Sequence, residues 1–281
     1  ADIKLALEKY RIRVISVDHE DEIAKLTRVV RALDIDPGAI TVFVRVQTKG
    51  HAAYELSKKF GAGPAYAVEL AERLAKTGYK VGLCFHVGSQ IEDPDTYERA
   101  LASADWVRNR LSFELAGLDV GGGFPAEYVG AGVPALEAYL AEVREGLARL
   151  ALPPDTALLA EPGRVLVADA CSLLVQIQLR KSHALYLNDG IFGSLSEMAL
   201  SRLRMPMRLI RRGGTPSKDT QAFTLYGPTC DSLDVLPGQF QLPADAREGD
   251  WLEIGQLGAY SNALTTRFNG FFPETFVTIA A

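Results

Sequence analysis

The feature that most constrains the fold of this chain is a regular alternation of two hydrophobic periods over its first 165 residues. Short apolar or period-2 runs are typical of strands, and runs of period 3.6 are typical of amphipathic helices. Successive strand–helix units of this kind predict a parallel sheet with right-handed crossovers. The predicted strands are 14–18, 41–46, 81–88, 115–122 and 157–163, and the predicted helices between them are 21–33, 65–77, 95–111 and 136–150.

Beyond about residue 165 the pattern changes to β-rich segments bounded by Gly and Pro. The predicted strands there are 173–179, 184–187, 222–226, 251–253 and 276–279, and residues 211–217 are predicted to form an exposed loop. We therefore predict an α/β domain over 1–165 and a mostly antiparallel β domain over 166–281. The five strands of the first domain could form an open doubly wound sheet or most of a (β/α)8 barrel.

Charge and cysteine content exclude several classes of protein. The net charge is -5, with 30 Lys+Arg against 35 Asp+Glu, and no basic run dominates, which argues against nucleic-acid binding. No apolar stretch reaches the roughly 20 residues of a bilayer span, so no membrane segment is expected. The three cysteines are far apart and predict a cytoplasmic protein with free thiols, with Cys84 and Cys171 packed in the core.

Candidate reactive groups follow the predicted strands of the first domain. Reactive groups of parallel α/β folds collect at the C-terminal ends of strands. A single Arg45 or His86 at such a position is more often structural. Three consecutive glycines cost backbone entropy, and their usual benefit is a close approach of backbone N–H groups to an anion. The strand ends carry Arg45, 86–89, 121–123 and 161–164.

These strand ends fit together as a site for one kind of cofactor. The bend formed by the three glycines 121–123, called the glycine bend below, would hold a phosphate together with Arg164 at the end of the next strand. The Glu161 carboxylate would lie deeper. This suits a phosphorylated heteroaromatic ring whose nitrogen stays protonated, namely pyridoxal 5′-phosphate (PLP), with His86 over the ring face. In the second domain, Cys230 and Asp231 adjoin in a Gly-Pro turn, where a buried carboxylate would be unpaired, so we expect them outside the core.

Taken in order, five motifs resemble those of the fold type III PLP-dependent decarboxylases, and most closely the ornithine decarboxylase branch. The resemblance implies a PLP-binding (β/α)8 barrel followed by a β domain, in a homodimer whose subunits share active sites. The dipeptide Cys230-Asp231 and the sequence Gly-Gly-Gly-Phe-Pro at 121–125 argue against the diaminopimelate branch. The motifs are Phe85-His86-Val87-Gly88-Ser89, Asp119-Val120-Gly121-Gly122-Gly123-Phe124-Pro125, Glu161-Pro162-Gly163-Arg164, Gly227-Pro228-Thr229-Cys230-Asp231, and Gly258-Ala259-Tyr260 with Phe268-Asn269-Gly270-Phe271.

The resemblance also implies a role for each matched residue. His86 would stack on the pyridine ring and Glu161 would bind its nitrogen. Cys230 would return a proton to the α-carbon after CO2 leaves, and Asp231 would bind the distal amine of the substrate, both reaching in from the partner subunit. Phe268 would pack beside substrate and ring, and no metal ligand is expected. The phosphate would be held by Ser89, Gly122, Gly123, Arg164 and Tyr260, with Gly163 and Arg45 also close to the cofactor.

This chain departs from the family pattern at two places, and both affect which family properties it is expected to share. The family's Schiff-base lysine follows Ala-Val on the first barrel strand, and none of the ten lysines here has that context. We therefore expect that the natural protein extends upstream, although a homologue that has lost its lysine is the alternative. Ornithine-type enzymes also carry a second aspartate for the distal amine, where this chain has Ser201.

The predicted function is PLP-dependent decarboxylation of ornithine or lysine to a diamine and CO2, in polyamine biosynthesis. One alternative is a catalytically inactive homologue that acts as a binding or regulatory protein. Others are a related PLP decarboxylase or racemase with another substrate, and a phosphate-binding barrel enzyme that does not use PLP.

Overall fold

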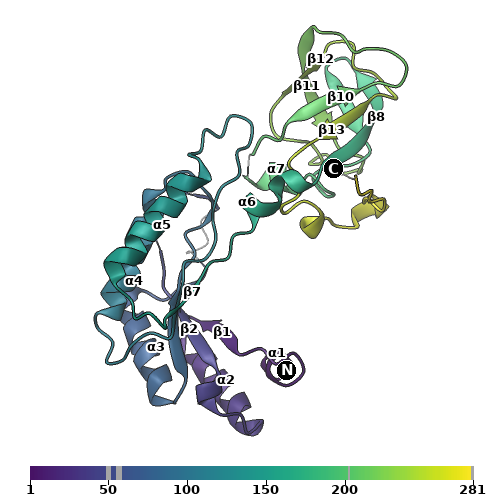
Figure 1. Cartoon of the computed structure of the whole chain (residues 1–281). Helices are drawn as coiled ribbons and strands as arrows, with labels where there is room; N and C mark the ends of the chain where they lie inside the picture. Colours follow the sequence, from purple (N-terminus) through teal and green to yellow (C-terminus); the bar gives the residue numbers. More distant parts are fainter. Residues whose placement is uncertain (49–51, 55–58, 202, 280–281) are drawn as a thin grey trace. The chain divides into compact units, whose positions relative to one another are not determined.

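The computed structural model describes residues 1–48, 52–54, 59–201 and 203–279. The chain divides into two compact units, which are described separately (Figure 1). Unit 1 comprises Ala1–Pro125 and Val133–Pro162, and unit 2 comprises Ala126–Gly132 and Gly163–Ala281. The predicted domain boundary after residue 165 lies close to the break at Pro162.

The centre of unit 1 is a parallel sheet of five strands, as the alternating pattern predicted. The residues Val42, Phe43 and Val44 are all buried in succession, as expected for a parallel strand covered on both faces. Strands β3 (Ala52–Tyr54) and β5 (Ser89–Ile91) form a separate antiparallel pair. The order of the main sheet is β1 (Val14–Val17), β2 (Thr41–Arg45), β4 (Lys80–Cys84), β6 (Gly117–Asp119) and β7 (Ala157–Leu159), with every neighbouring pair parallel.

The helices of unit 1 begin and end where local chemistry places them. Helix α2 starts after His19, whose Nδ1 accepts a hydrogen bond from the Asp21 N–H, and three acidic residues in its first turn suit the helix dipole. Helix α3 starts at Pro64, where a missing N–H costs nothing. Helices α3, α4 and α5 lie side by side along the sheet (Figure 1). The helices are α1 (Asp2–Glu8), α2 (Glu20–Ala32), α3 (Pro64–Lys76), α4 (Asp95–Arg108) and α5 (Leu136–Leu150), with a 3-10 turn at Pro37–Ala39.

Unit 2 is built on a six-stranded sheet whose neighbouring strands are antiparallel except for β9 and β11. The predicted α/β first part and mostly antiparallel β second part are therefore confirmed. The core of unit 2 includes Ile177, Leu185, Phe223 and Leu252, all at 0% exposure. The strand order is β10 (Met207–Ile210), β13 (Trp251–Ile254), β8 (Leu173–Lys181), β9 (Ala184–Leu187), β11 (Thr220–Tyr226) and β12 (Phe240–Pro243), and the helices are α6 (Arg164–Val167) and α7 (Ser196–Ser201), with 3-10 turns at Ala168–Ala170, Asn262–Leu264 and Phe268–Gly270.

Two expectations for the later part of the chain were wrong. Residues 276–279 have strand-like composition but form no strand, and Phe276, Val277 and Ile279 are 70–88% exposed. Apolar patterning is local, whereas a strand needs a ladder partner, and no described strand pairs with this segment. Cys171 is half-buried rather than part of the core, because it lies in the short link between the 3-10 turn Ala168–Ala170 and β8.

The segment Ala126–Gly132 belongs to unit 2, although it is flanked on both sides by residues of unit 1. Tyr128 is 2% exposed within unit 2. The Val129 N–H donates to the Arg204 carbonyl at 3.0 Å, and the Gln256 side-chain amide donates to the Glu127 carbonyl at 2.8 Å. These contacts hold the segment Ala126–Gly132, which follows the glycine bend in the chain, against other residues of unit 2.

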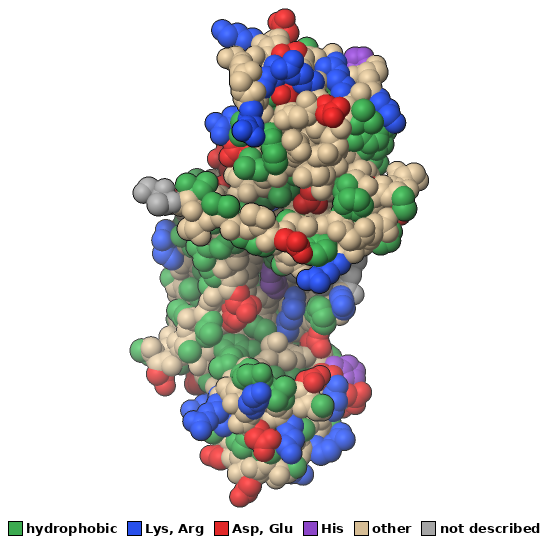
Figure 2. All heavy atoms as spheres, turned by 90° about the vertical axis from the view of Figure 1, so that its right-hand side faces the viewer, with side chains coloured by type: hydrophobic (Ala, Val, Ile, Leu, Met, Phe, Trp, Pro, Cys, Tyr) green, Lys and Arg blue, Asp and Glu red, His purple; other side chains and the backbone are tan. Residues whose placement is uncertain are grey.

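The surface carries charges of both signs. On the face seen in Figure 2, Lys and Arg side chains are interspersed with Asp and Glu. None of the helices in the described ranges combines the length and the apolar character needed to cross a bilayer.

Candidate active site

The glycine bend, Glu161 and His86 lie together at the C-terminal end of the sheet in unit 1. The bend follows β6, and the Asp119 carboxylate accepts a hydrogen bond from the Gly121 N–H at 2.8 Å. The Glu161 N–H donates to the Gly121 carbonyl at 2.8 Å. A Cβ atom placed on Gly122 would lie 2.5 Å from the Glu161 carbonyl oxygen and 3.4 Å from His86 Nε2. The structure thus brings together three strand-end parts that the sequence predicted to form one site.

Two of the three glycines adopt backbone angles that other residues avoid. The φ angles of Gly121 and Gly123 are +65° and +111°, in the left-handed region that favours glycine. Gly122 has no such angle but is crowded by Glu161, so only a residue without a side chain fits there. The result is a bend whose backbone packs closely against the ends of the neighbouring strands.

The imidazole of His86 is held in one orientation. Its Nδ1 accepts a hydrogen bond from the Gly88 N–H at 3.1 Å, so the ring proton lies on Nε2 in the neutral form. Burial, and next the positive charge of Arg45, lower the pKa of His86. A neutral imidazole with a fixed plane is suited to stacking on an aromatic ring.

Glu161 is exposed at the end of β7, but the immediate surroundings of its carboxyl still raise the pKa of that group. Burial raises its pKa, the negative charge of Asp119 adds to this, and Arg45 opposes it. The pKa of Asp119 is also raised by burial, against the hydrogen bond from Gly121. A cationic N–H group placed against Glu161 would stabilise its ionised form, which is what a protonated pyridine nitrogen offers.

Tyr97 is a residue of this site that the sequence reasoning missed. Its hydroxyl donates to the Gly122 carbonyl at 3.0 Å, and its ring stacks on Phe124 with centroids 4.9 Å apart. The Ile91 N–H binds the Gly123 carbonyl at 3.1 Å, which places Ser89, buried on β5, beside the bend. The position of Tyr97 on the apolar face of the predicted helix 95–111 was the available signal, since a buried Tyr hydroxyl needs a partner.

In unit 2, two predicted phosphate ligands lie in contact. The guanidinium carbon of Arg164 lies 4.7 Å from the centre of the Tyr260 ring. Tyr260 has a φ of +60°, a strained angle of the kind that clusters at functional sites. Gly163 is exposed and directly precedes α6. Arg164 forms its ion pair with Glu197 at 2.7 Å, and this partner was not predicted.

The predicted substrate-facing residues of unit 2 also gather in one region. Cys230 is exposed, and the Asn269 side-chain amide donates to its Sγ at 3.1 Å. Asp231 is half-buried, and its Oδ1 accepts the Leu233 N–H at 2.9 Å. The Phe268 ring lies 4.8 Å from that of Phe192. The expectation that Cys230 and Asp231 lie outside the core is met.

Asp234 holds the turn that carries Cys230. It is 2% exposed, and its carboxylate accepts the Ile191 N–H at 3.0 Å and both the N–H and the hydroxyl of Thr229, at 3.0 and 2.7 Å. A buried carboxylate satisfied by several donors fixes the loops that it joins. The sequence showed Asp234 beside the motif but gave no sign of this role.

The side chains and backbone at the strand ends of unit 1 fit the ring of PLP. The bend leaves no room for a Cβ, a neutral flat imidazole adjoins it, and a carboxyl able to pair with a ring N–H lies on the neighbouring strand. Within the described ranges, no group of three or more His, Cys, Asp or Glu side chains could hold a metal ion.

Replacing Gly122 with alanine is expected to lower the free energy of unfolding by about 2 kcal/mol, because the added Cβ would collide with the Glu161 carbonyl and force the strand ends apart. Denaturant titration of the purified protein measures the change. Gly63→Ala is the matched control, since nothing lies within 4 Å of a Cβ there. Equal stability of the two variants would contradict the crowding described for the bend.

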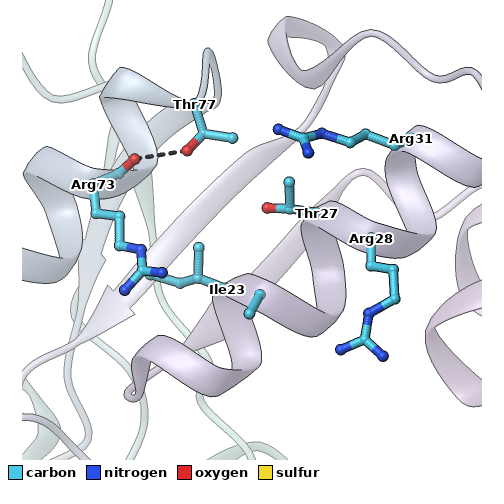
Figure 3. A pocket seen from close by; sticks show the side chains of 7 residues that line it. Ile23, Thr27, Arg28, Arg31, Arg73 and Thr77 are labelled. Carbon is cyan, nitrogen blue, oxygen red and sulfur yellow. Dashed lines mark hydrogen bonds between the residues drawn. The ribbon is translucent and has the colours of Figure 1, made fainter.

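A hollow with a volume of about 430 Å³ lies elsewhere in unit 1, between α2 and α3. Side chains of both helices line it, including Thr27, Arg31 and Arg73 (Figure 3). Arg73 is already paired with Glu20 at 2.6 Å. The hollow lies between helices and not at the strand ends, so it is no part of the candidate active site.

Comparison with known proteins places these features in a family. Residues 1–168 match the model of the pyridoxal binding domain of pyridoxal-dependent decarboxylases. The chain is 32% identical to lysine/ornithine decarboxylase of Selenomonas ruminantium, over 95% of this chain and 66% of that protein. It is 31% identical to antizyme inhibitor 2 of Xenopus laevis, over 94% of this chain and 60% of that protein.

A solved structure supports the same family. The crystal structure of lysine/ornithine decarboxylase from Vibrio vulnificus, complexed with cadaverine, superposes with a TM-score of 0.79 at 32% identity, over 96% of this chain and 70% of that chain. The chain spans less than two thirds of the length of the curated relatives it matches. The matched pyridoxal binding domain confirms the predicted cofactor class, and the chain belongs to the fold type III pyridoxal-dependent decarboxylase family.

Proposed function

We propose that the protein decarboxylates a basic amino acid, ornithine or lysine, to a diamine and CO2, as a step of polyamine biosynthesis. The observation that carries this proposal is the juxtaposition of His86, the glycine bend and Glu161 at one end of the sheet. The names of the relatives support it, since they include lysine/ornithine decarboxylases.

PLP, when bound, supplies the electron sink that loss of CO2 requires. The chain's own residues would bind the ring and the phosphate of the cofactor. Glu161 holds a proton on the ring nitrogen through a charge-assisted hydrogen bond, and His86 fixes the plane of the ring. The amide groups of Gly122 and Gly123 bind phosphate together with Ser89, Arg164 and Tyr260, while Gly163 and Arg45 lie close to the cofactor.

The residues of unit 2 would handle the substrate. The Cys230 thiol would give a proton to the α-carbon after CO2 leaves, with Asn269 orienting its sulfur. Asp231 would bind the distal ammonium group, and Phe268 would cover the apolar part of the substrate. We further propose a homodimer in which Cys230 and Asp231 act in the partner's site, and a cytoplasmic location, which suits the free cysteines.

Ser201 bears on the choice of substrate. Its hydroxyl donates to the Glu197 carbonyl at 2.6 Å and so serves the end of α7. It supplies no negative charge where ornithine-type enzymes carry a second aspartate. A single carboxylate from Asp231 would discriminate weakly between chain lengths, so the proposal covers both lysine and ornithine.

The test is a panel of basic amino acids incubated with the PLP-loaded protein, with each product identified by mass spectrometry. The expected products are cadaverine from lysine, putrescine from ornithine, or both. If PLP binds but no amino acid on the panel yields an amine, the proposed activity is wrong.

A second candidate function is that of a binding protein without decarboxylase activity. It is favoured by the similarity to antizyme inhibitor 2. The same panel separates the two functions, because a binding protein would release neither CO2 nor amine from any substrate.

A further inference from the structure

A buried ionic cluster surrounds the guanidinium of Arg164 in unit 2. The Arg164 and Glu197 side chains are 3% and 1% exposed, and Nη2 of Arg164 donates to Glu197 Oε1 at 2.7 Å. Nη1 donates to the Tyr128 hydroxyl at 3.0 Å, and the Tyr260 ring lies against the guanidinium carbon. These four residues are called the Arg164 cluster below.

Separate chain segments supply the members of the Arg164 cluster. Tyr128 lies in the segment Ala126–Gly132, Arg164 begins α6, and Glu197 lies in the first turn of α7. Partners held by separate segments fix the guanidinium in place before any ligand arrives, which is the condition for a preorganised anion site.

The charge of the cluster differs from that of an arginine alone. Burial opposes the charged form of Arg164, but Tyr128 and Glu197 outweigh it and raise its pKa, so the guanidinium remains a cation. An ionised carboxylate at 2.7 Å offsets that charge almost completely when viewed from outside the pair. An incoming phosphate therefore meets a neutral ion pair and repulsion from the carboxylate.

We propose that Glu197 is a positioning residue that orients Arg164 and offsets its charge, and thereby weakens the hold of this protein on the phosphate group of its cofactor. This inference rests on the proposed function, in which Arg164 binds that phosphate. In the absence of the Glu197 charge, the same guanidinium would attract a phosphate dianion with its full charge.

The experiment measures binding of pyridoxamine 5′-phosphate, a probe that needs no lysine, by equilibrium dialysis. The variant Glu197→Gln keeps the size of the side chain and an oxygen that accepts from Arg164, but carries no charge. We expect it to bind the probe about tenfold more tightly than the wild type, since one unit charge beside a bound anion has an effect of at least this size. Binding of unphosphorylated pyridoxamine should not change.

A second readout follows the phosphate itself. The 31P resonance of the bound probe should keep its dianion position to lower pH in Glu197→Gln than in the wild type, because the neighbouring negative charge has been removed. A purely structural role for Glu197 would weaken binding and would not produce this shift.

The matched control is Asp250→Asn. Asp250 pairs with Arg211 at 2.7 Å, with side chains 3% and 6% exposed, and Arg211 also pairs with Asp245 at 2.6 Å. The variant therefore makes the same charge change in another ionic cluster of unit 2. Its affinity for the probe should equal that of the wild type. Should Glu197→Gln fail to fold, Glu197→Asn, which leaves room for a water, is expected to show the same tightening.

The outcomes separate this inference from the proposed function. If the wild type binds the probe and the uncharged variants bind equally or more weakly, the role of Glu197 is overturned and the proposed function stands. If the wild type does not bind the probe, the proposed cofactor site is wrong and the inference falls with it.

Discussion

Glu161→Ala is expected to lower kcat by about a thousandfold, the size of effect typical for removal of one preorganised electrostatic partner of the transition state. The reason is the proton on the ring nitrogen, which the Glu161 carboxylate would hold through a charge-assisted hydrogen bond. Cofactor affinity should fall much less, because the residues proposed to bind the phosphate do not include this carboxylate. Steady-state kinetics and PLP dialysis measure the two effects.

Glu145→Ala is the matched control for this prediction. Glu145 lies on an exposed face of α5 in the same unit, so its replacement removes one carboxylate without touching the strand ends. Its kcat should equal that of the wild type. An unchanged kcat in Glu161→Ala would remove Glu161 from the reaction.

Cys230→Ala is expected to separate release of CO2 from formation of the amine. If the Cys230 thiol returns the proton to the α-carbon, the variant should still release CO2 while its yield of normal amine falls by about a hundredfold, the lower end of the usual contribution of a positioned acid. The position of the proton would then be uncontrolled, so other products or mixed stereochemistry should appear. Parallel assays of CO2 and of amine, with mass spectrometry of the products, measure this split.

The control for Cys230→Ala is Cys171→Ala. Cys171 is half-buried in the same unit, and its thiol contacts the Ser172 carbonyl at 3.6 Å. This variant should form one amine for each CO2. Normal amine from Cys230→Ala would exclude Cys230 from the proton transfer.

The parallel sheet of unit 1 could be predicted from the sequence because its signals are local. Pro64 marks the start of α3, and the spacing of Ala67, Leu70, Ala71 and Leu74 gives its buried face. Each predicted strand of this unit is found in the observed sheet. The bounds were less accurate, since the segment 115–122 contains only the short strand β6 before the chain turns at the glycines.

The candidate site was predictable where parallel strands force neighbours together. The ends of β4, β6 and β7 meet at one edge, so His86, Gly122 and Glu161 had to be close. The partners of these groups were not predictable, because Tyr97, Glu197 and Asp234 act through contacts between segments far apart in the chain. The absence of a strand at 276–279 was missed for the same reason, since pairing is a property of the whole sheet.

The most direct test of the central claim is a crystal structure of the protein with PLP bound. It should place the Glu161 carboxylate about 2.8 Å from the ring nitrogen, the distance of a charge-assisted hydrogen bond, with phosphate oxygens on the amides of Gly122 and Gly123. A cofactor bound with its phosphate away from the glycine bend, or with its ring nitrogen turned from Glu161, would contradict the account.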